Sequence, residues 1–307
     1  MPGPSRICIH EVGLRDGLQM ESRTVPTEKK LAWLRRILGS GVDVVQVGSF
    51  VHPGKVPQMA DTDRLFAEIA ASEGVPPGVT LSALVLNEKG LERGLACGVE
   101  MFCMGVSASE THSRKNTGMG MEEAAGRVIA MALGARSAGK RVQLSVQSAF
   151  GCGYEGEVPV ERVLGLVRRY CDAGLKEISL ADTAGHAVPD GVERMLGAVR
   201  GIDASVSLAC HFHNTYGLAL ANAYAALQSG AVSFESSVAG LGGCPFTKIA
   251  GGNVCTEDLV HMLGAMGIGC GVRLDDIIGV AADMAEFFGR DLPGTVYRTG
   301  TFVQAGR

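Results

Sequence analysis

Two histidines separated by one residue have the clearest potential for chemistry in this sequence. His211 and His213 follow an apolar run, residues 204–209, and precede a segment of helical periodicity. Side chains two apart on a strand project from the same face, so the two imidazoles would lie together at the end of that strand. This arrangement suits a pair of metal ligands. It also suits two hydrogen-bonded histidines in a core or cleft, and the pattern alone does not decide between the two.

Polar residues follow other apolar runs in the same way, among them Arg15 and Asp16 after the first run and Gln46 after the second. A carboxylate, two imidazoles and an amide oxygen at converging strand ends would form a site for a divalent cation, Mg²⁺ or Mn²⁺ rather than a structural Zn²⁺. Asp16 could instead pair with Arg15 or cap a helix. We expect both residues to lie at the end of the strand, where adjacent side chains point to opposite faces and take separate roles.

A glycine-rich loop, residues 239–253, follows the eighth apolar run. Its five glycines surround Cys244 and Asn253. Little side-chain bulk and high backbone freedom suit a lid that closes over a site, although a passive surface loop has the same composition. For Cys244, which precedes a proline, a proton-transfer or reactive role and a packing role are both open.

Eight short apolar runs alternate with helical segments, the pattern typical of a parallel sheet. The expected strands are residues 7–12, 42–47, 80–84, 101–105, 142–146, 177–180, 206–210 and 233–237. The expected helices are residues 28–38, 61–71, 88–96, 122–138, 160–172, 191–199 and 217–228. Glycines where helices give way to strands, Gly98, Gly174 and Gly230, support these boundaries. Eight such units without a dividing linker predict a TIM (β/α)8 barrel, whose active site lies at the carboxyl ends of the strands.

We expect one catalytic domain over residues 1–307. The barrel would cover about residues 7–267, helices near 256–266 and 274–288 would complete and cap it, and residues 291–307 would form a tail of weak pattern. An open doubly wound sheet is the second choice. That fold needs a glycine fingerprint after its first strand, and this chain carries charge in the corresponding turn.

The composition is that of a soluble globular protein. The chain has 307 residues, 46% of them hydrophobic and 20% charged, and its net charge of −4 excludes a strongly basic nucleic-acid surface. The nine cysteines are odd in number and lack the CxxC spacing, which disfavours a disulfide framework or a thiolate zinc site. Without a leader, a lipidation signal or an apolar run long enough for a membrane, we expect a cytoplasmic protein.

Four stretches closely resemble 3-hydroxy-3-methylglutaryl-CoA lyases. They are EVGLRDGLQ at residues 11–19, SFVHP with VPQM at residues 49–59, HFHNTYG at residues 211–217, and SVAGLGGCPF through GN to TEDL at residues 237–259. The resemblance runs from about residue 7 to residue 289. It implies a TIM barrel that uses a divalent metal ion, Mg²⁺ or Mn²⁺, to cleave an acyl-CoA by a retro-Claisen type of reaction. With 3-hydroxy-3-methylglutaryl-CoA as substrate, the products are acetyl-CoA and acetoacetate.

The resemblance also implies roles for particular residues. The implied metal ligands are Asp16, His211, His213 and Asn253. The implied catalytic residues are Arg15, Cys244, His211 and Asp182. The implied substrate contacts are Gln19, Gln46 and Ser49. The metal would acidify the substrate's tertiary hydroxyl, Arg15 would face the charge of the enolate, and Cys244 or His211 would move protons.

The chain departs from the lyase pattern near the expected site. Gln46 stands in VQVGSF where these lyases usually carry Glu, Leu14 replaces the usual Pro, and Met20 and Ser22 replace a common Asn and Lys. Loss of the carboxylate leaves Arg15 and the metal less neutralised. We therefore expect a pocket that prefers a differently charged or shaped acyl group, and the reaction type is better supported than the substrate.

Several other functions are compatible with parts of the pattern. A sister lyase would cleave citramalyl-CoA or an isohexenylglutaryl-CoA. A condensing synthase of the isopropylmalate type is disfavoured because no C-terminal regulatory domain follows the barrel. A catalytically inactive scaffold is hard to reconcile with a residue at every metal position. We expect an acyl-CoA partner and neither nucleic acid nor membrane, and assembly into a homo-oligomer is compatible with the sequence.

Overall fold

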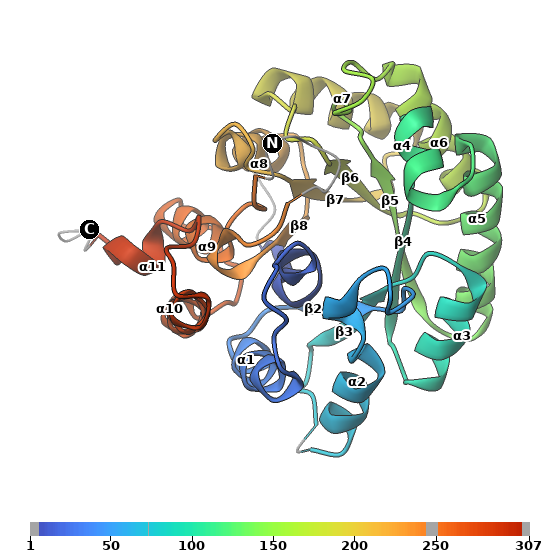
Figure 1. Ribbon diagram of the computed structural model, residues 1–307. Coiled ribbons are helices and arrows are strands. Elements are labelled where there is room, and N and C mark those ends of the chain that lie inside the picture. The colour runs from blue at the N-terminus through green and yellow to red at the C-terminus, as the bar shows by residue number, and fades with distance from the viewer. Residues whose placement is uncertain (1–5, 73, 244–250, 303–307) are drawn as a thin grey trace.

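Eight parallel strands form a closed barrel (Figure 1). The computed structural model describes residues 6–72, 74–243 and 251–302. The strands are β1 (Cys8–Glu11), β2 (Val44–Ser49), β3 (Thr80–Leu84), β4 (Met101–Ser107), β5 (Arg141–Gln147), β6 (Glu177–Asp182), β7 (Ser207–Phe212) and β8 (Ser233–Ser236). They pair in chain order, and β1 pairs with β8 from Cys8 opposite Ser233 to Glu11 opposite Ser236, which closes the ring. The prediction of a TIM barrel is confirmed.

Helices surround this barrel (Figure 1). They are α1 (Thr27–Gly39), α2 (Thr62–Ala70), α3 (Glu88–Ala96), α4 (Glu110–Thr117), α5 (Met121–Ser137), α6 (Val160–Asp172), α7 (Pro189–Ile202), α8 (Ala219–Gln228), α9 (Thr256–Ala265), α10 (Leu274–Phe288) and α11 (Val296–Thr299). Shorter turns are η1 (Gly13–Gly17), η2 (Pro57–Met59) and η3 (Val238–Gly240). Gly98, Gly174 and Gly230 have φ angles of 78°, 72° and 87° beyond the ends of α3, α6 and α8, as the helix stops predicted.

The sequence pattern predicts neither α4 nor α11. The α4 segment reads ETHSRKNT, which lacks an apolar face for periodicity to reveal. Its start is set locally, because the hydroxyl of Ser109 accepts a hydrogen bond of 3.1 Å from the N–H of His112. Within the described ranges, no helix has both the length and the apolar character needed to cross a membrane.

Helix α10 packs on α1. The indole Nε1 of Trp33 in α1 donates to Oδ2 of Asp283 in α10 at 2.9 Å, and Nζ of Lys29 lies 2.6 Å from Oδ1 of the same carboxylate. Trp33 is fully buried, and Phe287 meets it edge-on with ring centroids 5.5 Å apart. These contacts hold α10 against the start of the barrel.

The interior of the barrel is more polar than the layer between strands and helices. Phe102 of β4 packs outward on α3, so closely that a Cβ at Gly94 would lie 2.5 Å from its ring. Inside the ring, Nε2 of His10 and the hydroxyl of Ser82 are 2.8 Å apart and both residues are buried. This hydrogen bond offsets part of the cost of burying the two polar groups. The polar interior continues to the carboxyl ends of the strands.

Candidate active site

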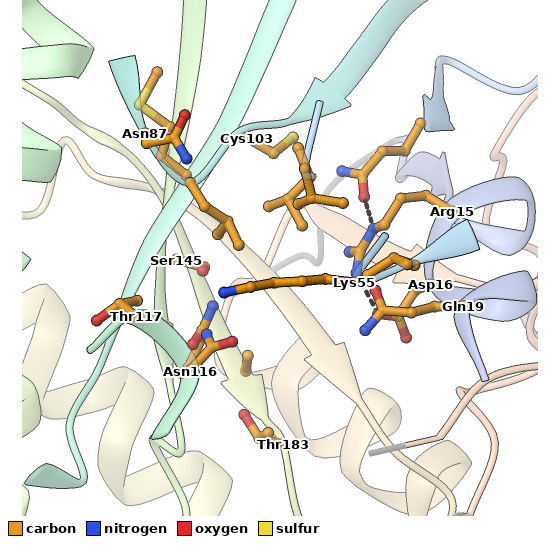
Figure 2. Close-up of a pocket in the computed structure, with 18 of the residues that line it drawn as sticks. Arg15, Asp16, Gln19, Lys55, Asn87, Cys103, Asn116, Thr117, Ser145 and Thr183 are labelled. Atoms are coloured by element: carbon orange, nitrogen blue, oxygen red, sulfur yellow. Dashed lines mark hydrogen bonds and ion pairs between the residues drawn. The ribbon is translucent and has the colours of Figure 1, made fainter. Parts of the chain in front are cut away.

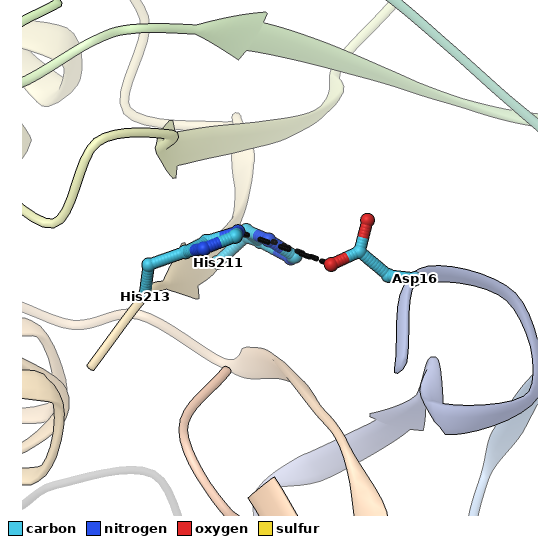
Figure 3. A group of neighbouring side chains, drawn as sticks. All are labelled: Asp16, His211 and His213. Carbon is cyan, nitrogen blue, oxygen red and sulfur yellow. Dashed lines mark ion pairs between the residues drawn. The ribbon is translucent and has the colours of Figure 1, made fainter. Parts of the chain in front are cut away.

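A carboxylate and two imidazoles meet at the carboxyl end of the barrel (Figure 3). His211 is the next-to-last residue of β7, His213 follows that strand, and Asp16 lies on η1. Oδ2 of Asp16 is 4.0 Å from Nε2 of His211 and 3.8 Å from Nε2 of His213. The three potential ligand atoms all lie within 4.8 Å of one another. The expected proximity of the imidazoles is confirmed, and the group has the donors and spacing to hold a divalent cation.

Asp16 and Arg15 reach this group from a tight π-helical turn. β1 ends at Glu11, and the N–H groups of Arg15 and Asp16 both donate to the carbonyl of Val12, at 3.0 and 2.8 Å. Glycine is needed in this turn, because a Cβ at Gly13 would lie 2.5 Å from Oε1 of Glu11. The expectation that the two residues end a strand and point to opposite faces is wrong, since the turn brings their side chains together.

The guanidinium of Arg15 binds Asp16 and Gln46 (Figure 2). Its Nη1 donates to Oδ1 of Asp16, and its Nε donates to Oε1 of Gln46. The ion pair weighed as an alternative to metal binding therefore forms, but on one carboxylate oxygen only. The other oxygen, Oδ2, faces the imidazoles. Burial alone would raise the pKa of Asp16, but Arg15 and the two histidines lower it well below its usual range, so the carboxylate is ionised.

Asn253 joins the group through a backbone bridge to His213. Its Nδ2 donates to Oδ2 of Asp16 at 2.8 Å and to the carbonyl of Leu241 at 3.0 Å. Its side-chain oxygen Oδ1 is buried and has no hydrogen-bond partner within the part of the chain that the structure describes. An unpaired buried acceptor is costly, and a cation would satisfy it. The donors of Asp16, His211 and His213 therefore fit a divalent ion, and the ligand role of Asn253, whose amide nitrogen faces Asp16, stays a prediction.

Glu235 of β8 is a functional neighbour that sequence reasoning missed. Its Oε2 lies 3.0 Å from Nδ1 of His211, and the hydroxyl of Ser179 donates to its Oε1 at 2.7 Å. Because Nδ1 of His211 faces this carboxylate, Nε2 is left to face Asp16, as in many metal sites. The sequence feature that could have revealed this residue is its charge within an otherwise uncharged expected strand, residues 233–237.

The charges in the group shift the pKa values of the two histidines in opposite directions. Burial would raise the pKa of Glu235, but the hydrogen bond with His211 keeps it at about 2. Burial alone would lower the pKa of His211, but the hydrogen bond and the charge of Glu235 outweigh burial and raise it. Burial and the neighbouring His211 lower the pKa of His213 to about 4, so that imidazole is neutral at pH 7, the form that binds metals.

A cavity of about 700 Å³ opens beside these groups (Figure 2). The predicted site residues that line it are Arg15, Asp16, Gln19, Gln46, His211 and His213. Three exposed cations, Lys55, Lys89 and Lys115, also contribute to its wall. The cavity thus combines a buried anionic and imidazole group with a cationic periphery.

Comparison with known proteins identifies the family. The HMGL-like family model matches residues 6–284. A hydroxymethylglutaryl-CoA lyase of Bacillus subtilis, YngG, is 39% identical over 293 residues, which cover 95% of this chain and 97% of that protein. The chain belongs to the HMGL-like family. A Pseudomonas aeruginosa relative, named as a lyase for 3-hydroxy-3-isohexenylglutaryl-CoA and hydroxymethyl-glutaryl-CoA, is 37% identical and covers 94% of each chain.

A solved HMGL-like structure shares the entire architecture. An HMG-CoA lyase from Acinetobacter baumannii, in complex with coenzyme A and 3-methylmalate, superposes with a TM-score of 0.92 at 32% identity, covering 99% of this chain and 98% of that one. The HMG-CoA lyase of Bacillus subtilis gives a TM-score of 0.91 at 38% identity, over 97% of this chain and 99% of that chain. The barrel and its C-terminal helices are therefore the family's fold.

The remaining predicted residues are placed differently within this HMGL-like barrel. Ser49 and Asp182 are buried, and neither is among the described residues that line the cavity. The two oxygens of Asp182 accept hydrogen bonds from the N–H groups of His186, at 2.8 Å, and Ala187, at 3.1 Å. Burial raises the pKa of Asp182 to about 7 despite these bonds. The catalytic and substrate-binding roles of the two residues stay predictions.

Cys244 lies outside the described residues, as do residues 245–250 of the loop expected to act as a lid. The described flanks reach the site from both sides, because Gly243 lines the cavity and the carbonyl of Gly251 lies 3.3 Å from Nδ1 of His213. The roles of Cys244 and of the lid therefore also stay predictions.

Proposed function

We propose that this protein is a carbon–carbon lyase that cleaves 3-hydroxy-3-methylglutaryl-CoA into acetyl-CoA and acetoacetate with a bound divalent cation, Mg²⁺ or Mn²⁺. The observation that carries the proposal is the buried group of Asp16, His211 and His213 beside Arg15 in one cavity. Relatives named for this reaction match nearly the whole chain, which supports the same chemistry here.

Four side chains would hold the cation. Asp16, His211, His213 and the orphaned oxygen of Asn253 supply mixed oxygen and nitrogen ligands. When bound, the ion supplies Lewis-acid polarisation of the tertiary hydroxyl of the substrate. Oxygen ligands together with imidazole suit Mg²⁺ or Mn²⁺, and the set lacks the thiolates typical of structural zinc.

Arg15 is suited to stabilise the charge that develops during cleavage. When the hydroxyl loses its proton and the bond between C2 and C3 breaks, the bonding electrons move onto the thioester, which leaves as an enolate. The Arg15 guanidinium is fixed by Asp16 and Gln46, so it needs no reorganisation to receive this charge. Protonation of the enolate at C2 then gives acetyl-CoA, and the other fragment is acetoacetate.

We do not expect His211 to carry the proton in this reaction. Nδ1 of His211 is hydrogen-bonded with Glu235 at 3.0 Å, and Nε2, which faces Asp16 at 4.0 Å, is the nitrogen left to bind the cation. These contacts favour the ligand role over proton transfer. Cys244, in the loop after β8, is the remaining candidate from the sequence.

The lysines around the cavity suit the phosphates of coenzyme A. Lys55, Lys89 and Lys115 are exposed, and Figure 2 shows Lys55 extended across the pocket. Ammonium groups pair with phosphate oxygens through charge-assisted hydrogen bonds. The related Acinetobacter enzyme was solved with coenzyme A, which supports a CoA thioester here.

The test is a cleavage assay with identified products. The chain, stripped of metal by a chelator, is given Mg²⁺ or Mn²⁺ and 3-hydroxy-3-methylglutaryl-CoA, and both products are identified by mass spectrometry. We expect equal amounts of acetyl-CoA and acetoacetate, and only with metal present. No cleavage in this assay, together with condensation and release of CoA when acetyl-CoA and a 2-oxo acid are supplied instead, would support a synthase.

A further inference from the structure

Two loop segments contribute to the wall of the cavity on the side of Lys55. The first, residues 19–25, follows the turn that carries Arg15 and Asp16, and it lines the cavity at its start. The second, residues 51–57, follows β2 and lines the cavity over most of its length, including Lys55. The Lys55 side chain extends from this second segment across the cavity (Figure 2).

Neither segment is held by the regular hydrogen bonds of a helix or a strand. Residues 21–26 form no helix or strand. Residues 52–55 are exposed. Their turn is closed locally, because the N–H groups of Lys55 and Val56 both donate to the carbonyl of His52, at 2.9 and 3.3 Å. Contacts outside each segment must therefore fix one segment against the other.

Gln58 supplies such contacts. It is buried and lies directly after the second segment, in η2. Its Nε2 donates to the carbonyls of Glu21, at 2.9 Å, and Arg23, at 2.8 Å. Its Oε1 accepts a hydrogen bond of 3.2 Å from the N–H of Val25. The amide of Gln58 therefore uses both of its N–H groups and its oxygen on the backbone of the first segment.

A buried lysine fixes the backbone of Gln58 in turn. Nζ of Lys30, in α1, donates to the carbonyl of Gln58 and lies 2.7 Å from Oδ1 of Asp61. The hydroxyl of Thr27 donates to the other oxygen of Asp61 at 2.9 Å. Lys30 is only 1% exposed, and an ammonium group is costly to bury unless it is paired in this way. Gln58 is thus anchored on α1 while its side chain holds the first segment.

We propose that Gln58 is a positioning residue for coenzyme A, and that it sets the place of Lys55 in the cavity by tying the two segments together. The inference rests on the proposed lyase function and deepens it, because Lys55 is one of the lysines suited to the phosphates of coenzyme A. Loss of the Gln58 amide should weaken this contact. It should leave the turn that carries Arg15 and Asp16 in place, since the carbonyl of Val12 holds that turn separately.

The binding of coenzyme A, measured by titration calorimetry, tests the proposal without turnover. Lys55→Met removes the ammonium group and should raise Kd by about tenfold, the scale of one charge-assisted hydrogen bond. Gln58→Ala should also raise Kd. The double variant should bind no more weakly than Lys55→Met alone, because Gln58 acts through Lys55. Gln228→Ala, at the exposed end of α8, is the matched control and should leave Kd unchanged.

A merely structural role of Gln58 predicts different results. Wild-type Kd in folded Gln58→Ala or in Lys55→Met, or effects that multiply in the double variant, would overturn the proposal. With 3-hydroxy-3-methylglutaryl-CoA, Gln58→Ala should raise KM more than it lowers kcat, and the reverse would also overturn it. If Gln58→Ala does not fold, Gln58→Asn repeats the test with an amide on a shorter side chain.

The wild-type protein separates this inference from the proposed function. If it binds coenzyme A and the variants behave as expected, but it cleaves no 3-hydroxy-3-methylglutaryl-CoA, the proposed reaction fails while the role of Gln58 stands. If it cleaves this thioester and the variants bind coenzyme A as wild type does, the inference alone fails. Absence of coenzyme A binding to the wild type would overturn the inference and the role proposed for the lysines.

Discussion

The carboxylate of Glu235 lies 3.0 Å from Nδ1 of His211, and the opposite nitrogen of that ring faces Asp16. We infer that Glu235 positions His211 and increases its basicity as a ligand. Glu235→Gln should weaken metal binding by roughly 10-fold to 100-fold, the usual effect of losing such a partner. Titration calorimetry with Mn²⁺ measures this directly and separately from catalysis.

The conservative variant and a neighbouring residue provide the controls for Glu235. Glu235→Asp keeps the charge and should retain more of the affinity than Glu235→Gln. Ser179→Ala removes only the hydroxyl that donates to Glu235, and should have the smallest effect of the three. Equal Mn²⁺ affinity in wild type and Glu235→Gln, with both folded, would contradict the positioning role.

Asp16→Asn should abolish tight metal binding. The variant keeps the size of the side chain but removes the negative charge that Arg15 and the two histidines stabilise. We expect metal occupancy, measured by elemental analysis after dialysis, to fall sharply, and turnover to fall with it. Asp190→Asn, on the exposed start of α7, is the matched control and should keep both. Full occupancy with normal turnover in Asp16→Asn would remove Asp16 from the ligand set.

Arg15→Lys should reduce kcat more than it raises KM. The guanidinium uses Nε toward Gln46 and Nη1 toward Asp16, and lysine cannot reproduce this two-sided contact. A charge aimed at the developing enolate acts on the transition state, so its loss should appear in kcat. Steady-state kinetics with 3-hydroxy-3-methylglutaryl-CoA measures both constants. A rise in KM alone would mean that Arg15 only holds the substrate.

Glu11 should make the free energy of unfolding fall as pH rises. Its carboxyl group is fully buried, and burial raises its pKa from 4.5 to about 7 although Gly13, Val238 and Thr256 donate hydrogen bonds to it. Between pH 4.5 and pH 7 the unfolded chain releases this proton while the folded chain retains it. The folded state therefore loses stability across this window, by up to about 3 kcal/mol, and the loss is constant above it.

The Glu11→Gln variant isolates that effect. Its free energy of unfolding, from urea titrations of the metal-free protein at pH 5 and pH 8, should fall less over this interval than that of wild type. Asp182 and Glu257 also have pKa values raised to about 7, but they are common to both proteins and cancel in the comparison. Parallel pH profiles for the two proteins would show that Glu11 is ionised throughout.

Local pattern was enough to predict the strands of this barrel and most of its helices. Buried parallel strands are short and apolar, and glycines with positive φ end the helices between them, so both signals lie within a few residues. The polar helix α4 has no apolar face, and its capping residue Ser109 is too common a residue type to identify a helix alone. Hydrophobic periodicity in the sequence reveals the elements that bury apolar surface, and α4 buries little of it.

The site was only partly predictable for two physical reasons. The turn that carries Arg15 and Asp16 depends on several N–H groups sharing the carbonyl of Val12, and no residue spacing signals that arrangement. The contact of Glu235 with His211 depends on the register between β7 and β8, which places these two residues opposite each other. Long-range register is set by the closed barrel, so a single strand does not reveal it.

Gln46 is the cavity residue at which the charge of this chain departs from the lyase pattern. Its Oε1 accepts from Nε of Arg15, and a register shift in β2 follows it directly. A glutamate here would keep that acceptor and add a charge beside Arg15, making the hydrogen bond charge-assisted and partly neutralising the guanidinium. It would also add a carboxylate to the wall of the cavity, which Glu235 already lines.

Gln46→Glu should therefore shift preference toward the small methyl substrate. We expect kcat/KM for 3-hydroxy-3-methylglutaryl-CoA, relative to that for its analogue with a propyl group at C3, to rise by a factor equivalent to about 1 to 2 kcal/mol, the scale of one altered polar contact. Gln143→Glu is the control, because it adds the same charge to the wall of the cavity on β5, opposite Cys103 of β4. A shift in both variants would assign the effect to the charge in the cavity, and a shift in Gln46→Glu alone to the contact with Arg15. If Gln46→Glu and wild type rank the thioesters identically, the glutamine does not determine the substrate, and selection must come from the rest of the cavity.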